Sequence, residues 1–182
     1  MSWLDRYQPL AGVRLNMVVS PEGSFVDSNG SSRGISNELD RSLIVHLRSL
    51  SDVYVTGGNT ARNEAYKVKE KPALAVITAT DYELPGAIML TPPAGVSAFP
   101  WVLATLTNRG FERILLEVGP SLAKEFLAGD LVDEFCLTLP SGTFELAEKV
   151  LEDFHSSLNL YSSEEIDGTL FTRWRRGNDS QG

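Results

Sequence analysis

A regular alternation of short apolar runs with segments of helical periodicity constrains the fold of this chain most strongly. The apolar, β-branched run 13–20 ends at Pro21-Glu22-Gly23, which predicts a strand that enters a turn. From Asn37 the leucines recur at steps of four, four and three residues, and Asn37 is a suitable N-cap, so a helix is predicted here. A very short link then leads to a second predicted strand over 52–56.

The alternation continues to the C-terminus. Further strands are predicted over 73–80, 87–91, 113–118 and 131–139, and further helices over 99–108 and 122–127. A closing hairpin is predicted from 158–161 and 169–174 around Asp167-Gly168. Strands that alternate with helices favour an α/β fold: a mostly parallel central sheet with an antiparallel C-terminal edge and helices on both faces.

The length and composition are those of an ordinary globular protein. A chain of 182 residues suits a single domain over 1–182, and we expect its ends, 1–12 and 176–182, to be flexible. The hydrophobic fraction of 42% and the charged fraction of 22% argue against disorder and coiled-coil structure. No run approaches the roughly 18 apolar residues of a membrane helix. Asp5 and Arg6 interrupt the segment where a signal peptide is apolar, so we expect a cytoplasmic protein without membrane contact.

The scarcity of cysteine and histidine limits the chemistry. Cys136 is the single cysteine, which excludes an intrachain disulfide, and with only His46 and His155 as imidazoles we expect no metal site. The net charge of −8 opposes binding to nucleic acid, whose phosphates require a basic surface. A phosphorylated small molecule is compatible with this charge, because local donors act at short range.

Two glycine-bearing turns follow predicted strands, which is where open α/β sheets bind ligands. They are Thr56-Gly57-Gly58-Asn59-Thr60 and Glu117-Val118-Gly119-Pro120-Ser121-Leu122. In the second turn a carboxylate closes an apolar run, which is costly unless it is paired or functional. The turn then opens a helix whose first N–H groups can hold an anion. Taken alone, each turn is better explained by the ability of glycine to reverse the chain.

Five blocks of sequence, in order, resemble the reductase domain of riboflavin biosynthesis, the pyrimidine reductase family. They are 16–23 (NMVVSPEG), 31–36 (SSRGIS), 47–60 (LRSLSDVYVTGGNT), 116–122 (LEVGPSL) and 131–134 (LVDE). The resemblance implies a three-layer, dihydrofolate-reductase-like fold and a homodimer. It also implies the reduction of 5-amino-6-(5-phosphoribosylamino)uracil by NADPH, with hydride transfer to C1 of the ring-opened ribose.

The resemblance also implies roles for individual residues. Glu117 and Asn16 would face the ribose as catalytic residues. Ser32, Arg48 and Lys71 would bind the substrate, the last two through its phosphate. The cofactor would contact Val19 and Gly34 at the nicotinamide, Thr60 and Glu64 near the adjoining ribose, Gly119, Pro120, Ser121 and Leu122 at the pyrophosphate, and Gly57 in the same site.

Structural roles compete with several of these assignments. Arg48 by itself is typical of a solvated surface charge, and Thr60 and Glu64 suit a helix cap and the helix dipole. The acidic pair 133–134 is predicted to be a charged interruption at an exposed strand start.

The chain departs from the family pattern at four places. Pro21-Glu22-Gly23 replaces Leu-Asp-Gly, Val118 replaces the first of two glycines, and Gly34 stands where a tryptophan is frequent. The glycine-rich stretch that normally follows the strand 131–139 is shortened to Pro140-Ser141-Gly142. These changes leave two alternatives open: a reductase of another heterocycle such as a pterin, and a nucleotide-binding paralogue without catalysis. The sequence lacks the zinc-ligating pattern of the deaminase domain often fused to this reductase, so deamination is expected in another protein.

Overall fold

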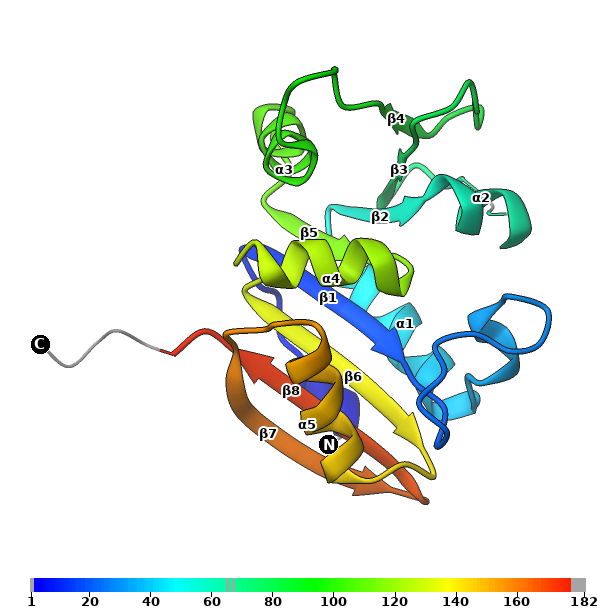
Figure 1. Ribbon diagram of the computed structural model, residues 1–182, viewed down its shortest axis with the longest axis vertical. Helices are drawn as coiled ribbons and strands as arrows, with labels where there is room; N and C mark the ends of the chain where they lie inside the picture. The colour runs from blue at the N-terminus through cyan, green and yellow to red at the C-terminus, as the bar shows by residue number, and fades with distance from the viewer. Residues whose placement is uncertain (1, 65, 67, 178–182) are drawn as a thin grey trace, which may run out of the picture.

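The computed structural model describes residues 2–64, 66 and 68–177. Within them, an eight-stranded sheet has the order β4-β3-β2-β5-β1-β6-β8-β7 (Figure 1). The strands are β1 (Gly12–Val18), β2 (Val53–Gly57), β3 (Ala73–Ile77), β4 (Ile88–Leu90), β5 (Arg113–Leu116), β6 (Glu134–Pro140), β7 (Asn159–Ile166) and β8 (Thr169–Arg175). The helices are the short 3-10 turns η1 (Trp3–Arg6) and η2 (Ser32–Gly34), then α1 (Glu38–Ser49), α2 (Gly58–Glu64), α3 (Ala98–Asn108), α4 (Pro120–Ala128) and α5 (Phe144–Asp153).

The strands from β4 to β6 run parallel, and β8 and β7 complete the sheet in antiparallel pairing. The central strand β1 pairs with β5 on one edge and with β6 on the other. In Figure 1 the arrowheads of β1, β2 and β6 point to one side of the molecule, and that of β8 points to the opposite side. The predicted α/β class, the mostly parallel sheet and its antiparallel C-terminal edge are therefore confirmed.

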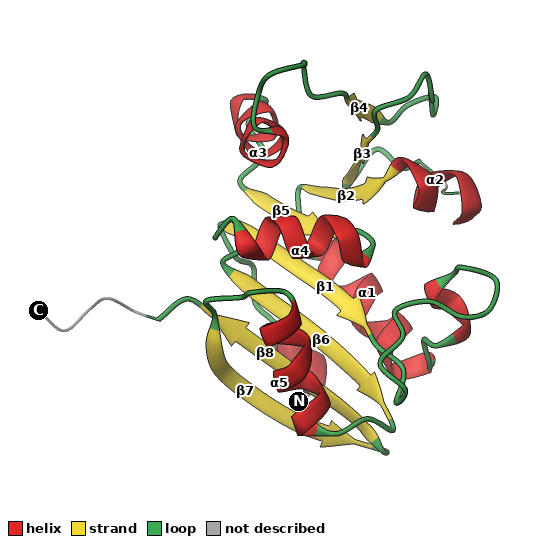
Figure 2. Ribbon diagram, viewed as in Figure 1, coloured by secondary structure: helices red, strands yellow, loops and turns green. Residues whose placement is uncertain are grey.

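Helices cover both faces of the sheet, as predicted (Figure 2). One buried cluster joins residues of α3, α4 and α5 to Val13, Leu15, Met17 and Val19 of the β1 segment. The other joins residues of α1 and α2 to Tyr7 and to the opposite sheet face. Because side chains alternate along a strand, the intervening β1 residues point away from the first cluster. β1 thus contributes to this cluster with every second residue, whereas the polar Arg14 and Asn16 lie at intervening positions.

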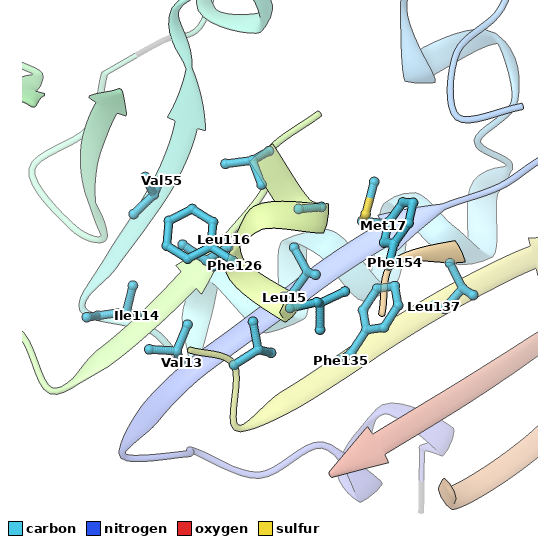
Figure 3. Close-up of a cluster of buried hydrophobic side chains, with 14 of the residues drawn as sticks. Val13, Leu15, Met17, Val55, Ile114, Leu116, Phe126, Phe135, Leu137 and Phe154 are labelled. Atoms are coloured by element: carbon cyan, nitrogen blue, oxygen red, sulfur yellow. The ribbon is translucent and has the colours of Figure 1, made fainter. Parts of the chain in front are cut away.

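The first cluster is the larger part of the core (Figure 3). Leu15 of β1, Phe126 of α4 and Phe135 of β6 are fully buried in it. Burial of a side chain of this size contributes roughly 1.5–3 kcal/mol. The packing holds β1 and α4 against each other, and both elements end or begin at the carboxyl edge of the sheet.

The helix α5 was missed by the sequence analysis, which assigned no element between 139 and 158. Its signals are nevertheless present in the chain. Thr143 caps the helix by accepting a hydrogen bond from the N–H of Leu146, and Ala147, Val150 and Leu151 are buried on one face.

The prediction of an exposed strand start at 133–134 is wrong for Glu134, whose side chain is fully buried at the beginning of β6. Its carboxylate accepts hydrogen bonds from Arg14, from Arg173 (Nη2 to Oε1, 2.7 Å) and from Arg175 (Nε to Oε1, 2.8 Å). These four residues are called the Glu134 cluster below. Burial, the strongest influence, acts to raise the pKa of Glu134, but the charges of Arg14 and Arg173 outweigh it and hold that pKa below its ordinary value.

A single domain over 1–182 and flexible ends at 1–12 and 176–182 stay predictions. Near the N-terminus, Trp3 packs on Phe171 with 4.7 Å between ring centroids, and Tyr7 is buried. Residues 1 and 178–182 lie outside the described part of the chain. In that described part, no helix combines the length and the apolar character of a membrane span, and no group of three or more acidic, cysteine or histidine residues could hold a metal ion.

Candidate active site

A cleft of about 970 Å³ opens at the carboxyl edge of the sheet. Its lining comes from the end of β1, the loop between β1 and α1, the α1 helix, the start of α2, the segment that follows α2, and the turn from β5 into α4. Ligands bind at this edge of open α/β sheets, because strand ends and helix starts converge there.

Most of the predicted site residues lie in this cleft. They are Asn16, Ser32, Arg48, Thr60, Lys71, Glu117, Gly119 and Pro120. The remaining predicted residues with described side chains do not line it. They are Val19, Gly34, Gly57, Ser121 and Leu122. The backbone of Glu64 belongs to α2, but its side chain lies outside the described residues.

Some of the residues outside the lining have a clear structural reason for their identity. Val19 is fully buried in the core. A Cβ atom at Gly57 would lie 3.1 Å from Cδ1 of Leu122, so glycine lets β2 approach α4 closely. A Cβ atom at Gly34 would overlap the carboxylate of Asp27. Their proposed contacts with a cofactor stay predictions.

An arginine–carboxylate pair occupies the centre of the site. Arg48, in the last turn of α1, donates from Nε to Oε1 of Glu117 at 2.7 Å and from Nη2 to Oε2. The side chain of Glu117 is 11% exposed and that of Arg48 is 31% exposed. Burial acts to lower the pKa of Arg48, but the hydrogen bond and the charge of Glu117 outweigh it and raise that pKa. The two-point geometry fixes the plane of the carboxylate.

Two tyrosine rings flank the same guanidinium. The Cζ atom of Arg48 lies 4.5 Å from the ring centroid of Tyr54 and 5.7 Å from that of Tyr66. The residue Tyr54 is buried on β2, and burial raises its pKa, so its phenol is neutral at physiological pH. Stacking on a ring face favours a flat, fixed guanidinium. Arg48 is therefore held by hydrogen bonds at its edge and by a ring against its plane.

Asn16 contributes a buried amide to the cleft. It lies on β1 between Leu15 and Met17, is 6% exposed, and its Oδ1 atom has no hydrogen-bond partner in the described structure. A buried polar atom without a partner is costly. The amide is thus prepared to bind a polar group that enters the cleft.

The start of α4 can receive an anion. Gly119 is the N-cap and Pro120 the first helical residue, and no side chain caps this end. No heavy atom lies within 4 Å of the position that a Cβ at Gly119 would occupy. The first N–H groups of a helix lack intrahelical partners and carry partial positive charge. Val118, which departs from the family pattern, is 6% exposed, belongs to the core cluster and also lines the cleft.

The charge around the cleft opposes the charge of the whole chain. The cationic lining residues are Arg33, Arg41, Arg48, Lys69 and Lys71, whereas Glu117 is the acidic residue of the described lining. The chain as a whole has a net charge of −8. A local excess of positive charge of this kind attracts anionic ligands.

Sequence reasoning missed several of these side chains. Tyr54 carried the clearest signal, since a phenol within an apolar strand needs a polar or charged partner. Arg33, Arg41 and Lys69 carried no signal, because surface cations of this kind are common. The position of Tyr66 beside Arg48 depends on the fold and could not be predicted from spacing.

The sequence profile of the RibD C-terminal domain family matches residues 11–144. The chain belongs to this family. The match confirms the resemblance to the pyrimidine reductases of riboflavin biosynthesis, and it includes every residue that lines the cleft.

Solved structures of RibD-type reductases share the fold of this RibD C-terminal domain protein. A pyrimidine reductase-like protein from Corynebacterium diphtheriae superimposes with a TM-score of 0.74 at 19% identity over 93% of both chains. A second similar structure is that of a Thermotoga maritima protein, the diaminohydroxyphosphoribosylaminopyrimidine deaminase/5-amino-6-(5-phosphoribosylamino)uracil reductase. It superimposes with a TM-score of 0.69 at 18% identity over 91% of this chain and 56% of the other.

A dihydrofolate reductase from Enterococcus faecalis, solved in complex with NADP(H), gives a TM-score of 0.62 at 13% identity over 92% of this chain and 98% of the other. These likenesses confirm the dihydrofolate-reductase-like fold. No curated protein matches the chain by sequence.

Proposed function

We propose that this protein reduces 5-amino-6-(5-phosphoribosylamino)uracil with NADPH as the hydride donor. The observation that carries the proposal is the convergence on one cleft of the oriented Glu117 carboxylate, the unpartnered Asn16 amide oxygen and the uncapped start of α4. Membership of the RibD C-terminal domain family supports it, as does the substrate named for the Thermotoga maritima relative.

The start of α4 fits the pyrophosphate of a dinucleotide. The space in front of Gly119 is open, and the N–H groups of Ser121 and Leu122 follow it in the first turn of the helix. Thr60, in the first turn of α2, lines the same cleft and would hydrogen-bond to a ribose of the cofactor. When bound, NADPH supplies a hydride to carbon C1 of the substrate.

The lysines of the segment that follows α2 fit the substrate phosphate. Lys69 and Lys71 line the cleft, and neither has a salt-bridge partner among the described residues. Ser32 lines it as well and would donate a hydrogen bond to the substrate. Phosphate binding here would anchor one end of the substrate, and the energy of that contact would help to orient the other end.

Glu117 and Asn16 would hold the ring-opened ribose. The Glu117 carboxylate accepts hydrogen bonds from ribose hydroxyl groups, and Oδ1 of Asn16 accepts one that it lacks in the free protein. Both side chains are almost buried, so these contacts are made away from bulk water. Holding the chain in one conformation brings C1 to the hydride donor and contributes through orientation.

We also propose that the protein works as a homodimer in the cytoplasm. β7, one of the two edge strands of the sheet, exposes Leu160 by 46% and Tyr161 by 55%, which supports an apolar surface for a second copy. Light scattering on the purified protein tests the assembly, and cell fractionation tests the location.

Oxidation of NADPH by the purified protein tests the activity directly. We expect saturable loss of NADPH absorbance with 5-amino-6-(5-phosphoribosylamino)uracil and none with dihydropterin substrates. The dephosphorylated pyrimidine serves as the matched control, and its KM should be higher. Saturable NADPH binding without oxidation in the presence of any of these compounds would contradict the proposal and favour a binding protein.

A further inference from the structure

A buried carboxyl group, that of Asp40 in the first turn of α1, has no part in the proposed reaction. The residue is fully buried, and it forms no ion pair with any other residue that the structure describes. Glu134 is buried to the same degree, but arginine side chains surround it. A buried acid without a counter-charge is costly, so Asp40 is a candidate for a function.

Ser36 connects Asp40 to the cleft. The Ser36 hydroxyl donates a hydrogen bond to Oδ2 of Asp40 at 2.6 Å, whereas its alternative acceptor, the carbonyl of Asn37, lies at 3.4 Å. A distance of roughly 2.5–2.7 Å is typical of a hydroxyl that donates to an ionised carboxylate. The N–H of Ser36 donates to the carbonyl of Ser32 at 3.0 Å. Both serines line the cleft, and the segment 32–36 is called the cleft wall below.

The surroundings of Asp40 make its charge sensitive to pH. Ser36 and Thr138 of β6 are the neutral polar groups that act on the carboxyl, and Arg41 is the charged group that does so. Burial outweighs all three and raises the pKa of Asp40 above its ordinary value of 3.8. Oδ1 of Asp40 and Oγ1 of Thr138 have no hydrogen-bond partner in the described structure, so a proton on Oδ1 breaks no existing bond.

We propose that Asp40 is a positioning residue whose carboxylate holds Ser36, and through it the cleft wall, in the conformation that binds the substrate. A hydrogen bond to an ionised group is about twice as strong as one between neutral groups. Protonation of Asp40 therefore loosens the wall, and substrate binding weakens as the pH falls. The inference rests on the proposed reductase function, because Ser32 is the wall residue proposed to contact the substrate.

Asp40→Asn removes the charge and keeps the shape of the side chain. At neutral pH we expect KM for the pyrimidine substrate to rise about fivefold and kcat to change by less than about twofold, because only the strength of a binding contact is altered. As the pH falls, KM of the unchanged protein should approach that of D40N. The difference between the two pH profiles isolates Asp40 from the other titrating groups of the cleft. Equal KM values at neutral pH would overturn the proposal.

Stability separates this role from a structural one. Because the folded-state pKa of Asp40 is raised, its ionisation lowers the stability of the fold as the pH rises from the unfolded-state pKa to the folded-state pKa. D40N lacks this loss, so its free energy of unfolding at neutral pH should equal or exceed that of the unchanged protein. A rise in KM together with a clear loss of stability would show that Asp40 only supports the fold.

A double-mutant cycle tests the route through Ser36. If Asp40 acts through the Ser36 hydroxyl, D40N/S36A should have the KM of S36A, and multiplied effects would overturn the proposal. Asp52→Asn is the matched control. Asp52 accepts a hydrogen bond from Nε of Arg113 at 3.0 Å and lies outside the cleft lining. D52N should keep KM and its pH dependence, and a rise in KM equal to that of D40N would contradict a specific effect on the wall.

Hydrogen exchange tests the inference without turnover. At neutral pH the Ser36 amide, which is bonded to the carbonyl of Ser32, should be less protected in D40N than in the unchanged protein. The amide of Leu15 in the central strand β1 should be protected equally in both. Absent turnover with the expected difference at Ser36 would refute the reductase function alone. Normal turnover with equal protection of Ser36 would refute the positioning role.

Discussion

Two arginine–carboxylate groups in this protein use the same chemistry in different surroundings. In the Glu134 cluster, a fully buried carboxylate binds guanidinium groups from β1 and β8. In the Arg48–Glu117 pair, the carboxylate is 11% exposed and opens onto the cleft. The first group joins strands that are distant in the sequence, and the second joins a helix to the end of a strand.

The two groups differ in burial and in access to the cleft, and this difference predicts different uses. The Glu134 carboxylate is fully buried among arginine side chains and cannot contact a ligand in the cleft. We therefore expect it to affect only the stability and register of the sheet. The Glu117 carboxylate lines the cleft, so it keeps the orientation that Arg48 gives it and lies within reach of a molecule in the cleft. Substitutions in each group should therefore change different observables.

The largest effect is expected from Glu134→Gln. The substitution leaves the guanidinium groups of Arg14 and Arg173 buried without a counter-charge. Removal of one partner from a buried ion pair lowers the free energy of unfolding by about 3–5 kcal/mol. Denaturant titration measures the loss. NADPH-dependent turnover per folded molecule should stay the same. A fall in kcat with normal stability would contradict the division between the two groups.

Glu117→Gln should give the reverse result. We expect kcat to fall by about 10²–10³-fold, an ordinary loss for a group that stabilises the transition state. The amide keeps the shape of the side chain, and the Arg48 side chain is 31% exposed to water, so the unfolding transition should move much less than in E134Q. Steady-state kinetics and thermal unfolding on the same preparations test this. A kcat equal to that of the unchanged protein would remove Glu117 from the mechanism.

The pH dependence of stability sharpens the comparison. The folded-state pKa of Glu134 lies below its ordinary value of 4.5. The ionised carboxylate therefore contributes to the stability of the fold above the unfolded-state pKa, and this contribution is lost as the pH falls through the folded-state pKa. Each proton taken up on unfolding contributes a slope of about 1.4 kcal/mol per pH unit. The difference in unfolding free energy between the unchanged protein and E134Q should therefore shrink below about pH 4.5. A difference that is constant from neutral to acid pH would show that the charge of Glu134 is unimportant.

The smallest effect is expected at an ion pair on the surface. Lys149 and Asp153 lie one turn apart on α5, with Nζ 2.8 Å from Oδ2, and both side chains are more than half exposed. Water screens such a pair, so Lys149→Ala should leave the melting temperature and kcat unchanged within error. A clear destabilisation would mean that exposure is a poor guide to the importance of ion pairs in this protein.

The fold and much of the cleft could be predicted from the sequence because their signals are local. Apolar runs, leucine periodicity and the turn after β5 lie in single segments, and they correctly indicated β1, α1 and the start of α4. The sequence blocks also indicated Asn16 and Glu117, which the structure brings to the same cleft.

The remaining features depend on contacts between distant segments. Arg14 and Glu134 become neighbours only when β1 pairs with β6, and Arg48 meets Tyr54 only when α1 packs on β2. No spacing in the sequence encodes such pairings. For this reason the burial of Glu134 was predicted wrongly, and the engagement of Arg48 with Glu117 was not anticipated.

The alternation of side chains along β1 has a consequence for how this protein can evolve. Leu15 and Met17 pack in the core, whereas Arg14 belongs to the Glu134 cluster and Asn16 reaches the cleft. An insertion or deletion of one residue would exchange these sets and damage both at once. Because loops tolerate insertions better than strands do, altered substrate preference should be easier to acquire through the loop after β1 than through the strand itself.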